Sequence, residues 1–192
     1  VGGGISQYSW DGQLQWNYEI VNDTYQLHHD IEPLPNGNIL VLAWERKTAN
    51  EAFGIGRQTI DNPLNEMWSE AILELELIGS NNANIVWEWH LWDHLIQDID
   101  PELPNYGVVA DHPELQDINY GNVGSMSDPL GPNGDWKHLN SIDYNEDLDQ
   151  IIISSRHHDE IYIIDHSTTI EEAASSSGGN SGKGGNYLFR WG

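Results

Sequence analysis

The sequence predicts an all-β protein, because its apolar residues recur mainly with a period of two and its short apolar runs are separated by turn-forming residues. Residues 14–20 alternate apolar and polar side chains around Trp16 and Tyr18. Residues 39–44 form a short apolar run directly after Pro-Asn-Gly-Asn at 35–38, which is a strong turn signal. Both segments are therefore expected to be strands.

The pattern continues toward the C-terminus. Residues 72–78 alternate and then meet Gly-Ser-Asn-Asn at 79–82, and the apolar run 85–89 follows, so these segments predict a hairpin. The same reasoning predicts further strands at residues 151–154, 161–164 and 187–191.

Three segments depart from this pattern. Residues 89–99 carry apolar side chains at helical spacing and are expected to form a short helix. Residues 100–135, rich in Pro, Asn, Gly and Asp, are expected to be a loop insertion, since loops of this length are usually functional or mobile. The Gly/Ser-rich residues 171–185 are expected to be a flexible surface connection. The alternative is that 181–185 offer backbone N–H groups and Lys183 to an anion.

A faint internal repeat supports one architecture in particular. The tryptophan-containing strands at 12–18, 84–89 and 185–191 resemble one another, and His residues follow the first two. One strand pattern repeated with variable loops is typical of successive β-propeller blades. By repetition alone, a β-sandwich remains an equal alternative to a propeller.

Composition narrows the functional classes. Thirty-one acidic and seven basic side chains give a formal net charge of −24, so we expect no nucleic-acid partner and no binding to an anionic membrane surface. Nine Trp and eight Tyr argue against disorder. Cysteine is absent, which excludes a disulfide framework or a thiolate site and is compatible with export.

The chain also lacks two kinds of segment. No apolar run approaches the roughly 20 residues of a membrane-spanning helix, so no membrane insertion is expected, and no signal peptide is visible. The chain begins without Met and stops on a strand-like segment, so we interpret both ends as cuts in a longer protein.

Histidine is the most informative residue type, with nine copies against seven Lys and Arg together. His28 and His29 either cap a strand as ordinary polar residues or face a ligand. By strand parity, His138, Asn140 and Ile142 share one face, where His138 and Asn140 can bind an oxyanion side by side. The alternative for this pair is an ordinary polar strand end.

Arg156 directly follows an apolar strand. Such an arginine is either an ion-pair partner or a clamp for a sulfate or phosphate group, whose oxygens a guanidinium matches. Adjacent histidines on a strand point to opposite faces, which disfavours zinc at 28–30 or 157–159. Structural calcium is more plausible, since oxygen ligands occur together in the acidic loop at Asp98, Asp100, Asp111, Asp117 and Asn119.

Five segments resemble, in the same order along the chain, segments of the arylsulfotransferase (ASST) family: HHDIEPLPNGNILVL (28–42), VWEWHLWDHLIQD (86–98), DWKHLNSIDYN (135–145), IIISSRHHDEIYIIDHSTT (151–169) and GGNSGKGGNYLFRWG (178–192). They run along nearly the whole chain. The combination D-W-x-H-x-N-S-I followed by S-S-R is the most specific part.

The resemblance implies a six-bladed propeller, of which this chain covers about half the blades. It implies transfer of a sulfuryl group from a phenolic sulfate ester to a phenol through a histidine intermediate, with no cofactor required. His138 matches the D-W-x-H histidine and Arg156 the S-S-R arginine. His29 matches the H-H-D histidine, and parity favours it over His28 because it shares a face with Ile31.

Further residues are expected to contact the substrate, namely His28, Asn140 and His94. The family's carrier histidine lies in a Q-H-D segment after the R-W-G strand, which is beyond Gly192. A periplasmic or secreted location is expected, with an aryl sulfate and a phenol as small-molecule partners. The alternative function is a non-catalytic propeller that serves as a binding or structural module and is stabilised by calcium.

Overall fold

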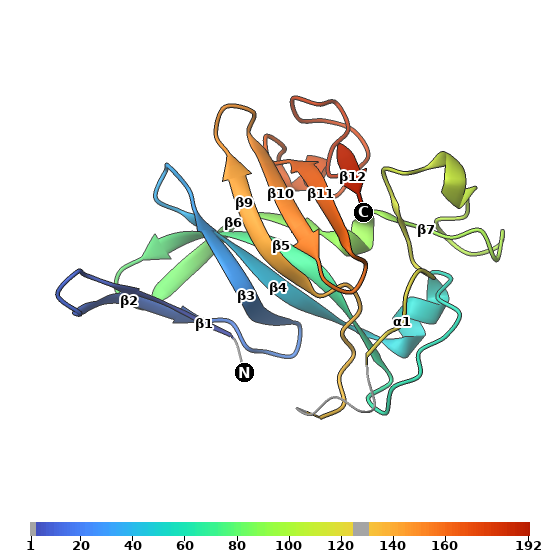
Figure 1. Cartoon of the computed structure of the whole chain (residues 1–192), viewed down its shortest axis with the longest axis horizontal. Coiled ribbons are helices and arrows are strands. Elements are labelled where there is room, and N and C mark those ends of the chain that lie inside the picture. The colour runs from blue at the N-terminus through green and yellow to red at the C-terminus, as the bar shows by residue number, and fades with distance from the viewer. Residues whose placement is uncertain (1–2, 125–130) are drawn as a thin grey trace.

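The computed structural model in Figure 1 describes residues 3–124 and 131–192, and antiparallel sheets make up most of its regular structure. The hairpin β1–β2 precedes a four-stranded sheet in the order β3-β4-β5-β6, and a second four-stranded sheet has the order β12-β11-β10-β9. The strand bounds are β1 Gly4–Tyr8, β2 Leu14–Glu19, β3 Tyr25–Pro33, β4 Ile39–Thr48, β5 Glu66–Ile78, β6 Asn82–His90, β9 Leu139–Asn145, β10 Gln150–Ser155, β11 Glu160–Asp165 and β12 Phe189–Trp191.

Shorter elements join the sheets. They are the helices α1 (Ala49–Gly54) and α2 (Ile170–Ala173), the 3-10 turns η1 (Leu91–Asp93) and η2 (Val109–Asp111), and the parallel pair β7 (Leu95–Ile96) and β8 (Gln116–Asp117). No helix among the described residues has the length and apolar composition needed to cross a bilayer.

The sheets pack in layers. One apolar cluster includes Leu40 and Ile72 from the β3–β6 sheet and Ile142 and Ile153 from the β9–β12 sheet. A second cluster joins the other face of the β3–β6 sheet to the β1–β2 hairpin through Trp16. Strands β4 and β5 are thus buried on both faces, which explains why residues 39–43 form an unbroken apolar run rather than an alternating one. The first strands of the two large sheets, β3 and β9, lie side by side.

The predicted strands are confirmed, and residues 72–78 and 85–89 pair within the β5–β6 hairpin. The three tryptophan-containing strands of the repeat correspond to β2, β6 and β12, each at the end of its sheet order. The chain is therefore mostly β, with several antiparallel sheets.

The short helix expected at residues 89–99 is wrong, since only the 3-10 turn η1 forms there. Trp89 pairs with Ile72 in the β5–β6 ladder, and Leu95 pairs with Gln116 in the β7–β8 pair. Trp89, Leu95 and Ile96 are buried in extended backbone, while Ile99 is exposed, so sheet pairing overrides the helical spacing.

The Gly/Ser-rich segment is organised by hydrogen bonds. A capping box between Thr169 and Glu172 begins α2. After the helix, the Ser181 N–H donates to Asp165 at 2.7 Å, and the Gly184 and Gly185 N–H groups donate to backbone carbonyls at 3.0 Å. Because these donors have partners within the chain, the alternative of an anion site at 181–185 is not supported.

Candidate active site

Two backbone irregularities place the histidines. His29 and His138 adopt left-handed conformations, with φ of 54° and 56°. His29 lies where the pairing register of β3 shifts, whereas His138 directly precedes β9, whose own register shift falls at Asn140. Such β-bulges redirect side chains and are frequent beside active sites. Positive φ is uncommon outside glycine, which marks these two positions as special.

The bulges overturn two parity arguments. His29 does not follow the alternation of β3, since Leu27 pairs with Ala43 and Ile31 with Val41, so the bulge interrupts the period between them. Asn140 is exposed while Ile142 is buried, so they do not share one face. Strand alternation holds only where the ladder is regular.

His28 and His29, expected to point to opposite faces, instead meet. Their Nδ1 atoms lie 2.9 Å apart, and the Nε2 atom of His29 lies 3.0 Å from the Nε2 atom of His138. His138 Nδ1 in turn hydrogen-bonds the Asp135 carboxylate. Residues 109 positions apart in the sequence are thus brought into direct contact where β3 meets β9.

The Glu70 side chain on β5 contacts the buried end of this chain of imidazoles. One carboxylate oxygen lies 2.9 Å from His28 Nε2, and the other accepts the Leu139 N–H at 2.9 Å. Glu70 and His28 are buried, and the His28 ring stacks on Trp44 with ring centroids 4.1 Å apart. A single buried carboxylate therefore connects the residues next to His29 and His138.

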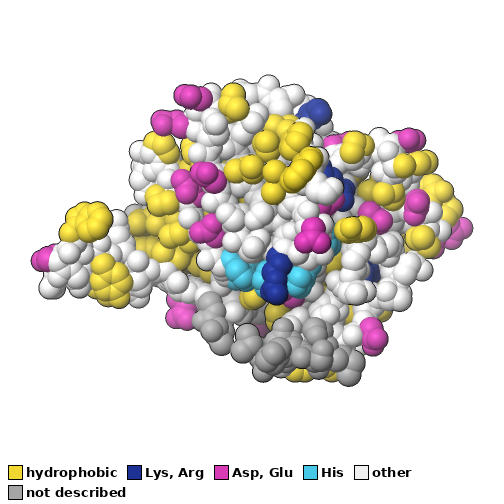
Figure 2. Space-filling view, viewed as in Figure 1, with side chains coloured by type: hydrophobic (Ala, Val, Ile, Leu, Met, Phe, Trp, Pro, Cys, Tyr) yellow, Lys and Arg dark blue, Asp and Glu magenta, His cyan; other side chains and the backbone are white. Residues whose placement is uncertain are grey.

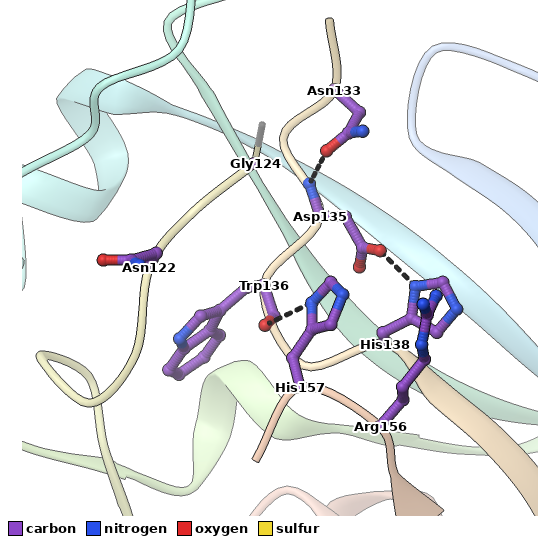
Figure 3. Close-up of a pocket in the computed structure, with 8 residues that line it drawn as sticks. All are labelled: Asn122, Gly124, Asn133, Asp135, Trp136, His138, Arg156 and His157. Carbon is purple, nitrogen blue, oxygen red and sulfur yellow. Dashed lines mark hydrogen bonds and ion pairs between the residues drawn. The ribbon is translucent and has the colours of Figure 1, made fainter. Parts of the chain in front are cut away.

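His138 and Arg156 line a pocket of about 320 Å³. Figure 3 shows the lining residues, which are Asn122, Gly124, Asn133, Asp135, Trp136, His138, Arg156 and His157. The backbone N–H of Arg156 donates to the His138 carbonyl at 3.0 Å, which holds the turn after β10 against the segment before β9. In Figure 2 the histidines and an Arg or Lys side chain form one group on the viewed surface.

Arg156 is exposed, and its guanidinium forms no ion pair or hydrogen bond with any other side chain in the described part of the chain. Other arginines differ: Arg190 pairs with Glu160, and Arg57 donates to backbone carbonyls. Of the two alternatives from the sequence, the structure thus gives Arg156 no ion-pair partner among the described residues. Its donors are available to a ligand.

Burial sets the charge states around the pocket. Burial lowers the pKa of His29, and the neighbouring His138 lowers it further. Burial also raises the pKa of the Glu70 carboxyl, although the adjacent His28 works in the opposite direction. Both shifts favour the uncharged form of the group concerned.

Not every predicted residue lies at this site. His94 is fully buried beside Trp89, with Nδ1 2.9 Å from the Asn186 amide oxygen and Nε2 2.8 Å from the Ala173 carbonyl oxygen. Asn140 accepts a hydrogen bond from Ser154 at 2.9 Å and does not line the pocket. His29 lines a separate cavity of about 140 Å³ together with His28 and contacts the pocket through His138.

Metal binding is less well supported. In the described residues, the only group of three His, Asp or Glu side chains with ligand atoms within 4.8 Å is Asp135, His138 and His157. Asp135 and His138 are already hydrogen-bonded to each other, and Arg156 places a positive charge in the same pocket. The predicted calcium ligands in the acidic loop form no such group.

Sequence reasoning missed Asp135, His157 and Glu70. Asp135 stands three residues before His138, which is a signal that the D-W-x-H motif already contains. Glu70 is a charged residue within the buried run 69–75, and a charge in such a position requires a partner.

The fold and site define a mostly β protein with a histidine- and arginine-lined pocket where two antiparallel sheets meet. The family model described as Arylsulfotransferase (ASST) matches residues 2–190, so the chain belongs to this family. No curated protein gives a significant match.

Proposed function

We propose that this protein transfers a sulfuryl group from an aryl sulfate ester to a phenol through a histidine intermediate. Family membership supports the class of reaction. The observation that carries the proposal is the Arg156 guanidinium, which lies without a side-chain partner among the described residues next to His138 in a pocket of about 320 Å³. A pocket of this size accommodates a sulfate ester.

The proposed chemistry needs positioning and charge stabilisation, as phosphoryl transfer does. Arg156 grips two sulfuryl oxygens with its guanidinium fork. His138 and His29, whose Nε2 atoms are 3.0 Å apart, give a proton to the departing phenolate and take one from the accepting phenol. Asp135 holds His138 in place through Nδ1, which leaves Nε2 facing His29 Nε2, so the two histidines share the proton that is exchanged with the reacting oxygen.

We also propose that the layered sheets are successive blades of a propeller. The β1–β2 hairpin, the β3–β6 sheet and the β9–β12 sheet pack face to face, and the two large sheets run through consecutive neighbouring strands. Radially packed four-stranded antiparallel sheets are the building units of a propeller. In this arrangement, β3 and β9 are the strands nearest the central channel.

The proposal is tested by measuring transfer from a panel of aryl sulfates to phenol with the complete protein as encoded. Arg156→Ala and His138→Ala should each lower kcat/KM by about 10²-fold or more, as expected when a transition-state charge partner or a general acid is lost. The matched control is Arg46→Ala, since Arg46 is largely exposed and pairs with Glu66. It should retain full activity.

Two results would contradict the proposal. One is a wild-type protein that binds aryl sulfates without turning them over, which would favour the non-catalytic binding module. The other is an Arg156→Ala variant as active as Arg46→Ala.

A further inference from the structure

Glu70 and His28 extend the two pocket histidines into the protein interior. Four successive contacts join the Glu70 carboxylate, His28, His29, His138 and the Asp135 carboxylate. The contacts from Glu70 to His28, His28 to His29, and His29 to His138 measure 2.9, 2.9 and 3.0 Å. Both imidazole nitrogens of each histidine are therefore engaged within the chain.

Counting protons shows what this chain holds. Each contact between two nitrogen or carboxylate acceptors is attractive only if one proton lies in it, so four contacts require four protons. Three neutral imidazoles supply only three. The fourth proton either makes one histidine an imidazolium or sits on a carboxyl group such as Glu70. The intact chain thus contains one proton that can be released without forming an imidazolate.

We propose that Glu70 and His28 are positioning residues that hold this fourth proton for His29 and His138 and take it back within each catalytic cycle. The inference rests on the proposed sulfuryl transfer. Glu70 fits the task because it contacts both halves of the site, through His28 on one side and the Leu139 N–H on the other. No other carboxylate in the described residues contacts His28.

The proton balance closes over two half-reactions. In the first, the S–O bond to the aryl oxygen breaks, its electron pair stays on that oxygen, and the oxygen takes a proton from Nε2 of His29 or His138. The lone pair of a carrier imidazole forms an S–N bond to the sulfuryl group as the S–O bond breaks. In the second, the oxygen of the accepting phenol forms the new S–O bond and its proton returns to the same Nε2. The S–N bond breaks, and its electron pair stays on the carrier imidazole.

Glu70→Gln tests the proposal, because the two contacts of Glu70 determine the orientation of a glutamine amide at this position. The Leu139 N–H requires an oxygen acceptor, so the glutamine NH₂ group faces His28 Nε2. His28 must then accept there and donate through Nδ1 to His29. His29 in turn donates through Nε2 to His138. All contacts remain filled with three neutral histidines, and the amide has no proton to release.

We therefore expect Glu70→Gln to reduce kcat selectively for poor leaving groups. With phenyl sulfate, whose phenol has a pKa of about 10, kcat should fall by about 10²-fold or more. With a nitrophenyl sulfate, whose phenolate leaves without a proton, kcat should fall by less than about tenfold. KM should change little for either substrate, since Arg156 and the pocket are untouched.

Glu74→Gln is the matched control. Glu74 lies on the same strand, is buried, and also pairs with a histidine, His166, at 3.0 Å, but outside the site. It should leave the ratio of the two kcat values at the wild-type level. An equal loss for both leaving groups in Glu70→Gln, or no loss at all, would overturn the proposal.

Nitrogen NMR of ¹⁵N-histidine-labelled protein gives a readout that does not depend on turnover. In Glu70→Gln, His28 and His138 should both carry their proton on Nδ1 and His29 on Nε2, with no imidazolium among them. If the histidines of Glu70→Gln carry their protons as they do in the wild type, the proposal that Glu70 and His28 hold a fourth proton is refuted. Complete absence of wild-type turnover together with the expected NMR change would refute the proposed function and leave the chain of histidines established.

Discussion

Replacing His94 with alanine separates a structural histidine from the pocket histidines. His94 is fully buried, stacks on Trp89 with ring centroids 5.6 Å apart, and meets Asn186 and Ala173 through its two ring nitrogens. Burial lowers its pKa, so it is uncharged near neutral pH. We therefore expect His94→Ala to reduce stability without altering the chemistry of the site.

The size of the effect follows from these contacts. Because uncharged His94 has one N–H, one donated hydrogen bond is lost at about 1 kcal/mol net, and the buried Ala173 carbonyl left without a donor costs about 1–3 kcal/mol. The aromatic stack contributes about 0.5–1.5 kcal/mol more. Together these terms predict a loss of about 3–5 kcal/mol in the free energy of unfolding. For a domain of this size, that lowers Tm by about 6–20 °C.

Urea and thermal unfolding, followed by tryptophan fluorescence, measure the loss. The control is His112→Ala, because the His112 side chain is partly exposed and pairs with Glu114, so its cost should stay below about 0.5 kcal/mol. Transfer activity should be measured well below the Tm of the variant and should match the wild type. Stability within about 1 kcal/mol of wild type combined with lost turnover would refute this reasoning and return His94 to the substrate site.

Two further predictions concern buried charges. Burial lowers the pKa of Lys137 well below its ordinary 10.5. As pH falls below about 10.5, the unfolded chain therefore binds a proton on this amine that the folded chain does not, and the free energy of unfolding declines. Lys137→Met should remove this slope as pH falls below about 10. Urea unfolding at several pH values measures it, and the same pH dependence in the wild type and the variant would contradict the prediction. Burial alone raises the pKa of Glu74, but hydrogen bonds from His166 and Asn38 outweigh it and lower the pKa to about 2. The stability lost in Glu74→Gln should therefore be largest above about pH 4.5 and disappear as pH falls toward 2, and a loss independent of pH would refute this.

The sequence predicts the regular parts of this fold well. Alternation and turn signals locate the β5–β6 hairpin and the strands around Ile153 and Tyr162, because each of these strands pairs with its neighbour in the sequence across a short turn. The short helix at residues 89–99 fails for the opposite reason. Its apolar spacing arises from extended backbone paired with strands that lie distant in the sequence, which a local pattern does not reveal.

The candidate site is harder to predict from alternation. His29 and His138 were selected by motif, and the structure brings them together, but the parity argument for His29 does not survive the bulge. The role of Glu70 is not predicted by local patterns, because it depends on a contact with Leu139, which lies 69 residues further along the chain. Local patterns thus find the residue types, while the connections between them depend on the packing of two sheets.

A shared left-handed conformation underlies the meeting of two histidines from separate sheets. His29 and His138 have nearly the same φ, and each lies in or directly before the strand that begins a four-stranded sheet in chain order. Because β3 and β9 lie side by side, the two side chains come into contact. One buried carboxylate, Glu70, then contacts His28 and the Leu139 N–H, each one residue from a left-handed histidine. The same backbone conformation in two neighbouring sheets therefore produces a convergent site that neither sheet contains alone.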